Sequence, residues 1–124
     1  MTYDFEAILA CARKELASHG FDEVHSNVKV IRYQHRATRQ VVYIDRDGKP
    51  DQKKVSFAFL PRDLTAFAGL EGVAKAPTGK HSSNYTVFPK TLSRKGEMQH
   101  EGGRVVLKFA SNYTSIIEEI KRGA

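Results

Sequence analysis

The sequence predicts a single α+β domain, in which a mainly antiparallel sheet of about five strands carries the N- and C-terminal helices on one face. Three observations predict this class. Apolar residues recur at helical spacing near both ends of the chain, they alternate at strand spacing in its middle, and turn residues separate the short apolar runs. The length of 124 residues fits one domain over residues 1–124.

The first half of the chain is predicted to form a helix followed by three strands. Residues 3–19 place apolar side chains on one helical face, and Gly20 ends that helix. Residues 28–36, 39–45 and 53–60 are rich in β-branched and aromatic residues, which favours strands. Between the second and third strands, Asp47-Gly48 and Pro50 predict the turn of a β-hairpin.

The second half is predicted to continue with a short helix, two strands and a C-terminal helix, giving the order αβββαββα. Asp63 is the expected cap of the short helix. Glycine, serine and proline mark the intervening loops. The expected elements are the helix 62–74, the loop 75–84, the strand 85–89, the loop 90–103, the strand 104–110 and a helix whose apolar face begins at Tyr113.

Positive charge is the clearest functional signal in the sequence. The chain has a formal net charge of +6 and a pI near 9.6. No acid occurs between Glu23 and Asp45, or between Glu71 and Glu97. Two acid-free basic stretches are typical of a surface that faces a polyanion. The predicted phosphate contacts are Arg32, Arg36, Arg39, Lys80, Lys90, Arg94 and Lys95.

These cations lead to the hypothesis of a small basic binding protein without enzymatic activity that contacts nucleic acid. Aromatic residues alternate with the cations, and stacked aromatics along a sheet bind single strands in several modules. The rings considered are Tyr33, Tyr43, Tyr85 and Phe88, which would otherwise fill the core. The alternative is a protein-interaction or inhibitor module, from a phage or other mobile element, that binds an acidic protein surface.

A third hypothesis is a metal-dependent nuclease. Some nucleases hold Mg²⁺ with an aspartate on one strand and an acid-x-lysine on the next, and Asp45, Asp51 and Lys53 follow that order. All three residues are expected at a solvated turn, which counts against the site. The histidines form no spaced pair with one another or with a cysteine, so neither a metal nor a cofactor is predicted.

The location expected from the sequence is the cytoplasm. Cys11 is the only cysteine, which suits reducing conditions. The N-terminal residues include acids and do not resemble a signal peptide. No apolar run is long enough to cross a bilayer, so no membrane association is expected.

The tetrapeptide Ser-Asn-Tyr-Thr occurs twice, at residues 83–86 and 111–114. In the second copy, Ser111 or Asn112 can cap the C-terminal helix. The first copy borders the basic loop, where a partner is expected to bind.

Overall fold

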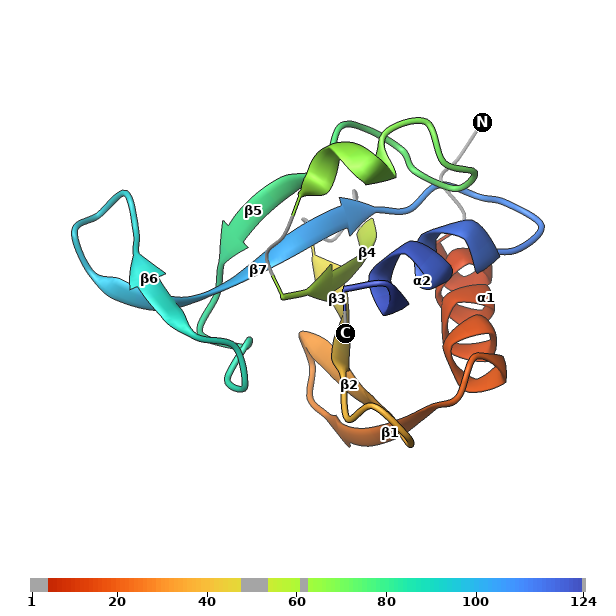
Figure 1. The fold of residues 1–124 in the computed structure, drawn as a ribbon, viewed down its shortest axis with the longest axis horizontal. Helices are drawn as coiled ribbons and strands as arrows, with labels where there is room; N and C mark the ends of the chain where they lie inside the picture. Colours follow the sequence, from red (N-terminus) through yellow and green to blue (C-terminus); the bar gives the residue numbers. More distant parts are fainter. Residues whose placement is uncertain (1–4, 48–53, 61–62, 124) are drawn as a thin grey trace.

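The computed structural model describes residues 5–47, 54–60 and 63–123, and it confirms an α+β fold with a mainly antiparallel sheet (Figure 1). The described residues form seven strands, two α-helices and one 3-10 helix. The elements are α1 (Phe5–Ser18), β1 (Phe21–Ser26), β2 (Val30–His35), β3 (Val41–Asp47), β4 (Lys54–Phe59), η1 (Leu64–Phe67), β5 (Thr78–His81), β6 (Lys90–Leu92), β7 (Met98–Val106) and α2 (Thr114–Lys121).

The strands follow the order β1-β2-β3-β4-β7-β5, and every described pair is antiparallel. The long strand β7 organises one end of the sheet. Its second half lies between β4 and β5, while its first residues pair with β6. The β6–β7 hairpin therefore extends away from the helices, at the left of Figure 1.

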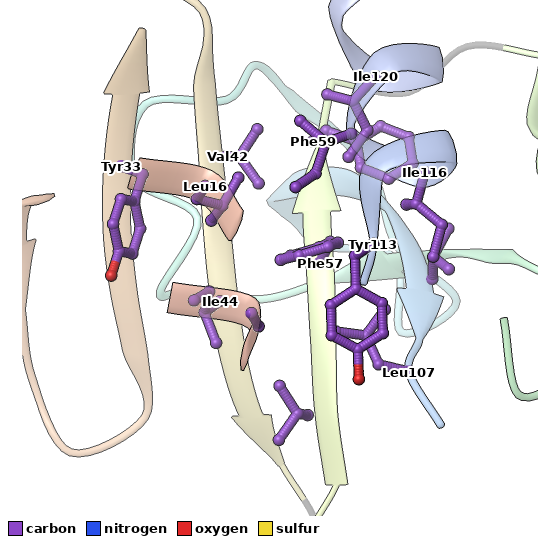
Figure 2. Close-up of a cluster of buried hydrophobic side chains, with 14 of the residues drawn as sticks. Leu16, Tyr33, Val42, Ile44, Phe57, Phe59, Leu107, Tyr113, Ile116 and Ile120 are labelled. Atoms are coloured by element: carbon purple, nitrogen blue, oxygen red, sulfur yellow. The ribbon is translucent and has the colours of Figure 1, made fainter. Parts of the chain in front are cut away.

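One face of the sheet packs against both helices. Alternate residues of β3 and β4, among them Val42, Ile44 and Phe57, lie in one buried cluster with the apolar faces of α1 and α2 (Figure 2). Burial of alternate apolar side chains is the main stabilising contribution to such a layered fold. The helical packing face that the sequence predicts is therefore present.

The opposite face carries a smaller aromatic cluster that no helix covers. Val30, Tyr43 and Ala58 from the sheet pack there against Tyr85 and Phe88. The Tyr43 ring lies 5.4 Å from that of Tyr85 and 5.1 Å from that of Phe88, measured between centroids. The segment that connects β5 to β6 therefore closes this side of the molecule.

The predicted strand 85–89 is wrong, because this segment forms turns. The Tyr85 amide donates to the carbonyl of Ser82, and the Phe88 amide donates to the carbonyl of Tyr85. The apolar character that suggested a strand comes from rings that pack individually onto the sheet. Local composition could not distinguish a β-strand from a turn segment whose rings are buried one by one.

Three strands are missing from the sequence prediction. β1 buries only its first residue, Phe21, so it shows no alternation. β5 and β6 lie in the segments 75–84 and 90–103, which were expected to be loops, and the second of these also holds the start of β7. Their side chains are mostly polar, and they are strands because their backbones pair with β7.

Other predicted elements agree with the structure. The strands predicted at 39–45 and 53–60 correspond to the antiparallel pair β3 and β4, although the turn with Gly48 and Pro50 lies outside the described residues. Asp63 caps a helix, but only the four residues of η1 are helical. Neither helix in the described part of the chain is long and apolar enough to cross a membrane.

The N-cap of α2 is Tyr113, which makes no side-chain capping bond, so neither Ser111 nor Asn112 caps the helix as predicted. Asn112 lies one residue earlier, and its Oδ1 accepts a hydrogen bond from the Thr114 amide at 3.1 Å. Glu15 on α1 adds a contact that the sequence did not reveal, because its Oε1 accepts from the Tyr113 amide at 2.9 Å. A carboxylate at this position satisfies a free amide and complements the helix dipole.

Candidate nucleic-acid interface

The structure places the seven predicted phosphate contacts in two parts of the fold. Lys80 is on β5, Lys90 is on β6, and Arg94 and Lys95 lie in the β6–β7 turn. The remaining three are on β2 or in the β2–β3 turn. A hollow of about 360 Å³ brings together Lys80, Arg94 and Lys95, and its other lining residues are Gly79, His81, Ser93 and Gln99.

Lys80 has a carboxylate partner inside the protein. Its Nζ lies 3.0 Å from Oδ2 of Asp45, whose side chain is only 5% exposed, whereas that of Lys80 is 25% exposed. The Tyr85 hydroxyl donates to the same carboxylate oxygen at 2.5 Å. The charge of Lys80 is therefore largely balanced within the fold.

This contact also shows that the sheet is strongly curved. Lys80 is on the edge strand β5, and Asp45 is on β3, three places away in the strand order. Three strand spacings span about 14 Å in a flat sheet, which is more than a lysine side chain can reach. β5 and the residues of β7 that pair with it must therefore curl over the aromatic cluster.

The position of Asp45 corrects the expectation of a solvated turn residue. Asp45 is 3% exposed and lies within β3. Its partners in the predicted metal site, Asp51 and Lys53, lie outside the described residues. Over residues 5–47, 54–60 and 63–123, no three His, Cys, Asp or Glu side chains form a group that could hold a metal ion.

A chain of polar side chains, not predicted from the sequence, joins β6 to its neighbours. Thr91 Oγ1 donates to Glu101 Oε1 at 3.2 Å, and it lies 2.7 Å from His81 Nε2. If the threonine proton is directed to the glutamate, the His81–Thr91 contact requires the tautomer with the proton on Nε2. These bonds fix the base of the β6–β7 hairpin against β5 and β7.

The hairpin presents cations without internal partners. Lys90, Arg94 and Lys95 are exposed, and none forms an ion pair within the described part of the chain. Glu97 is the one acid among residues 90–98, which leaves a formal charge of +2 on this segment because three cations face one anion. The Ser93 hydroxyl is buried beside them and has no hydrogen-bond partner in the structure.

The hairpin also exposes an apolar pair. Leu92 and Met98 are opposite each other in the register of β6 and β7. They are 67% and 58% exposed, respectively. Both side chains are therefore open to solvent on the same hairpin as the three cations.

The other three predicted contacts have different surroundings. Arg36 is exposed and pairs with Asp22 at 2.6 Å. Arg32 is half-buried on β2 and faces the same side of the sheet as Tyr43, its partner in the register. Arg39 lies in the β2–β3 turn with a φ of 65°. None of these three lines the hollow beside the hairpin.

The aromatic residues considered for base stacking are buried. The four exposed fractions are 4% for Tyr33, 1% for Tyr43, 0% for Tyr85 and 3% for Phe88. Their faces pack inside the protein, so they cannot stack on bases in this conformation. The alternative that these rings fill the core is correct.

Comparisons with protein-family models, curated proteins and solved structures give no match. The contacts, charge and exposure of the described residues are therefore the basis for assigning a function.

Cys11 does not have the surroundings of a reactive cysteine. It is half-buried on α1. Burial, and then the negative charge of Glu15, raise the pKa of its thiol above the ordinary value of 9.0. A thiol that is harder to ionise is a poor nucleophile near neutral pH.

Proposed function

We propose that this protein binds nucleic acid through the β6–β7 hairpin, which contacts the phosphate backbone. The observation that carries the proposal is the set of three exposed cations, Lys90, Arg94 and Lys95, that have no ion pair within the described residues. They lie on a hairpin that projects from the sheet (Figure 1). A projecting cationic hairpin can contact a polyanion without a rearrangement of the rest of the fold.

Phosphate contacts suit these side chains. Arginine and lysine neutralise phosphate oxygens, and the release of condensed counterions drives binding. The Ser93 hydroxyl is not counted among the direct contacts, because its oxygen is buried. Lys80 is not counted among the direct contacts in this proposal, because its ammonium group is paired with Asp45.

The experiment measures oligonucleotide affinity as a function of salt concentration. Labelled single- and double-stranded DNA and RNA of about 20 nucleotides are long enough to cover the hairpin. Fluorescence anisotropy should show affinity that falls as salt rises. The variant Arg94→Ala/Lys95→Ala should weaken binding to duplex DNA and reduce the slope of log K against log salt by about 2, or 0.9 for each lost contact.

A matched control removes two exposed cations elsewhere. Lys14 on α1 and Arg122 after α2 are both exposed, and Lys14→Ala/Arg122→Ala changes the net charge by the same amount. This control should keep most of the affinity and the salt slope. Equal losses in the two double variants would show that net charge, not the hairpin, governs binding. An absence of salt-dependent binding to every oligonucleotide would refute the proposal.

A second candidate function is binding to an acidic protein surface, and the exposed Leu92–Met98 pair is the observation that favours it. Protein interfaces combine an apolar centre with a charged rim. In that case the wild-type protein should bind no oligonucleotide but should capture one acidic protein reproducibly, and Leu92→Ser/Met98→Ser should abolish capture. Retention of the partner by this variant would exclude the hairpin as the interface.

The nuclease hypothesis receives no support from Asp45, because Lys80 and Tyr85 already bind its carboxylate. We therefore expect the bound oligonucleotides to stay intact in the presence of Mg²⁺. Cleavage that requires Mg²⁺ and disappears in Asp45→Asn would reverse this conclusion.

A further inference from the structure

A well-defined turn closes the β6–β7 hairpin. The Ser93 amide donates to the carbonyl of Glu97 at 2.8 Å, and the Gly96 amide donates to the carbonyl of Ser93 at 3.0 Å. Gly96 has a φ of 79°, which is the left-handed conformation that a three-residue hairpin loop requires at its last position. Arg94 and Lys95 are the two residues between Ser93 and Gly96, so this turn holds both cations at the tip of the hairpin.

One face of the hairpin carries the exposed apolar pair together with a cation. Residues two apart in a strand share a face, and opposite residues of an antiparallel pair do so too. Lys90 and Leu92 on β6 are opposite His100 and Met98 on β7. These four residues therefore share one face, which we call the outer face of the hairpin, and Thr91 belongs to the other face.

Hydrogen bonds at the base of the hairpin fix its orientation. The Thr91 hydroxyl contacts Glu101 on β7 and His81 on β5. On the outer face, His100 Nδ1 lies 2.6 Å from the carbonyl oxygen of Phe88. The hairpin projects from these contacts (Figure 1). A partner therefore meets a preformed surface, and binding costs little ordering of the chain.

The dimensions of this hairpin fit the major groove of B-form DNA. The three residues of β6 extend about 10 Å, and the major groove is about 8.5 Å deep. The two strands lie about 5 Å apart, so with their side chains they fit a groove about 12 Å wide. The minor groove is only about 6 Å wide, and the major groove of double-stranded RNA is too narrow for side chains to enter.

The side chains of the hairpin suit this groove as well. Leu92 and Met98 are 67% and 58% exposed, so a contact with an apolar group would remove both from water. The apolar group that base pairs present in the major groove is the C5-methyl group of thymine. Three cations surround this single apolar pair, and nucleic-acid interfaces are more positively charged than protein–protein interfaces. Charge and shape together favour DNA over a protein as the partner of the outer face.

We propose that the β6–β7 hairpin enters the major groove of duplex DNA, where Leu92 and Met98 contact thymine methyl groups. Arg94 and Lys95 at the tip contact phosphates that border the groove. This inference rests on the proposed function, because the cations must first bring the hairpin to nucleic acid. It adds the class of nucleic acid and a preference for A·T base pairs.

Two duplexes that differ only in methyl groups test the contact. One is an alternating A·T duplex, and the other has deoxyuridine in place of every thymine. Fluorescence anisotropy at one salt concentration should show binding to the deoxyuridine duplex that is weaker by about fourfold for each methyl group contacted. The salt slope should be the same for both duplexes, because their phosphates are the same.

Leu92→Ser/Met98→Ser tests whether the apolar pair causes this preference. Both side chains are exposed, so the melting temperature should change little. The variant should bind the two duplexes equally and keep the salt slope of the wild-type protein. Val28→Ser/Phe109→Ser is the matched control, because these residues are 89% and 68% exposed and lie outside the hairpin. This control should keep the preference for thymine.

The possible outcomes separate this inference from the proposed function. Salt-dependent binding of the wild-type protein with equal affinity for the two duplexes would overturn the groove contact and leave the proposed function intact. An absence of binding to any nucleic acid would overturn both. A thymine preference that persists in Leu92→Ser/Met98→Ser would come from the shape of the duplex and would overturn the role of the pair. Capture of an acidic protein that requires the pair, without a thymine preference, would assign the outer face to a protein interface instead.

Discussion

Replacing Lys80 with methionine tests the buried ion pair on the second face of the sheet. The substitution keeps most of the aliphatic stem and removes the charge. Asp45 then keeps the Tyr85 hydroxyl but loses the ammonium group 3.0 Å away. Removing one partner of a fully buried pair costs about 3–5 kcal/mol, because the remaining charge stays desolvated.

The partial exposure of the Lys80 side chain makes the expected loss of stability smaller than this. Because the Lys80 side chain is 25% exposed, water can partly replace it near the carboxylate. We therefore expect a loss of about 2–4 kcal/mol from the free energy of unfolding. Urea denaturation should show a midpoint lowered by about 1–2 M.

A double-mutant cycle identifies the cause of this loss. Asp45→Asn removes the charge that Lys80 balances, so Lys80→Met/Asp45→Asn should be more stable than the sum of the single effects by about 1–3 kcal/mol. Additivity within about 0.5 kcal/mol would refute the pairing. A different result would be that Lys80→Met keeps the urea midpoint of the wild-type protein but loses oligonucleotide binding. That result would make Lys80 the phosphate contact that the sequence predicted.

Two further predictions concern the backbone and the pH dependence of stability. Gly72 and Gly96 both have a positive φ, but a Cβ on Gly72 would lie 2.7 Å from the Tyr113 ring, while Gly96 faces open space. Gly72→Ala should cost roughly 2–4 kcal/mol and Gly96→Ala about 1 kcal/mol by urea denaturation, and equal losses would contradict this packing. Burial raises the pKa of Cys11 above 9.0 and that of Tyr33 above 10.0. The folded state therefore keeps these protons to higher pH than the unfolded state, so stability should fall as pH rises past 9.0 and then past 10.0. Cys11→Ala/Tyr33→Phe should reduce this decline in urea midpoints measured across that range, whereas an unchanged decline would assign it to other groups.

The sequence predicted those parts of the fold in which one element buries one regular face. The helical spacing in α1 and the alternation of large and small side chains in β4 identify their elements, although β4 proves to be buried on both faces. The same reasoning failed for β1, β5 and β6, which bury few side chains and are held by backbone pairing. It also failed for residues 85–89, whose rings are buried without a period.

The candidate sites show the same division. Composition and charge order identified Lys90, Arg94 and Lys95 as cations in an acid-free segment, because charge is a property of each residue. Only the tertiary structure could show that Lys80 is paired with Asp45, since 35 residues separate them along the chain.

The exposed apolar pair on the hairpin could not be predicted from the sequence either. Leu92 and Met98 lie in a segment that was expected to be a loop, and they become opposite residues only when β6 pairs with β7. The sequence by itself determined the class of fold, the excess of positive charge and the periodic core. The tertiary structure decided which charges are balanced and which surfaces are open, because both depend on contacts between distant segments.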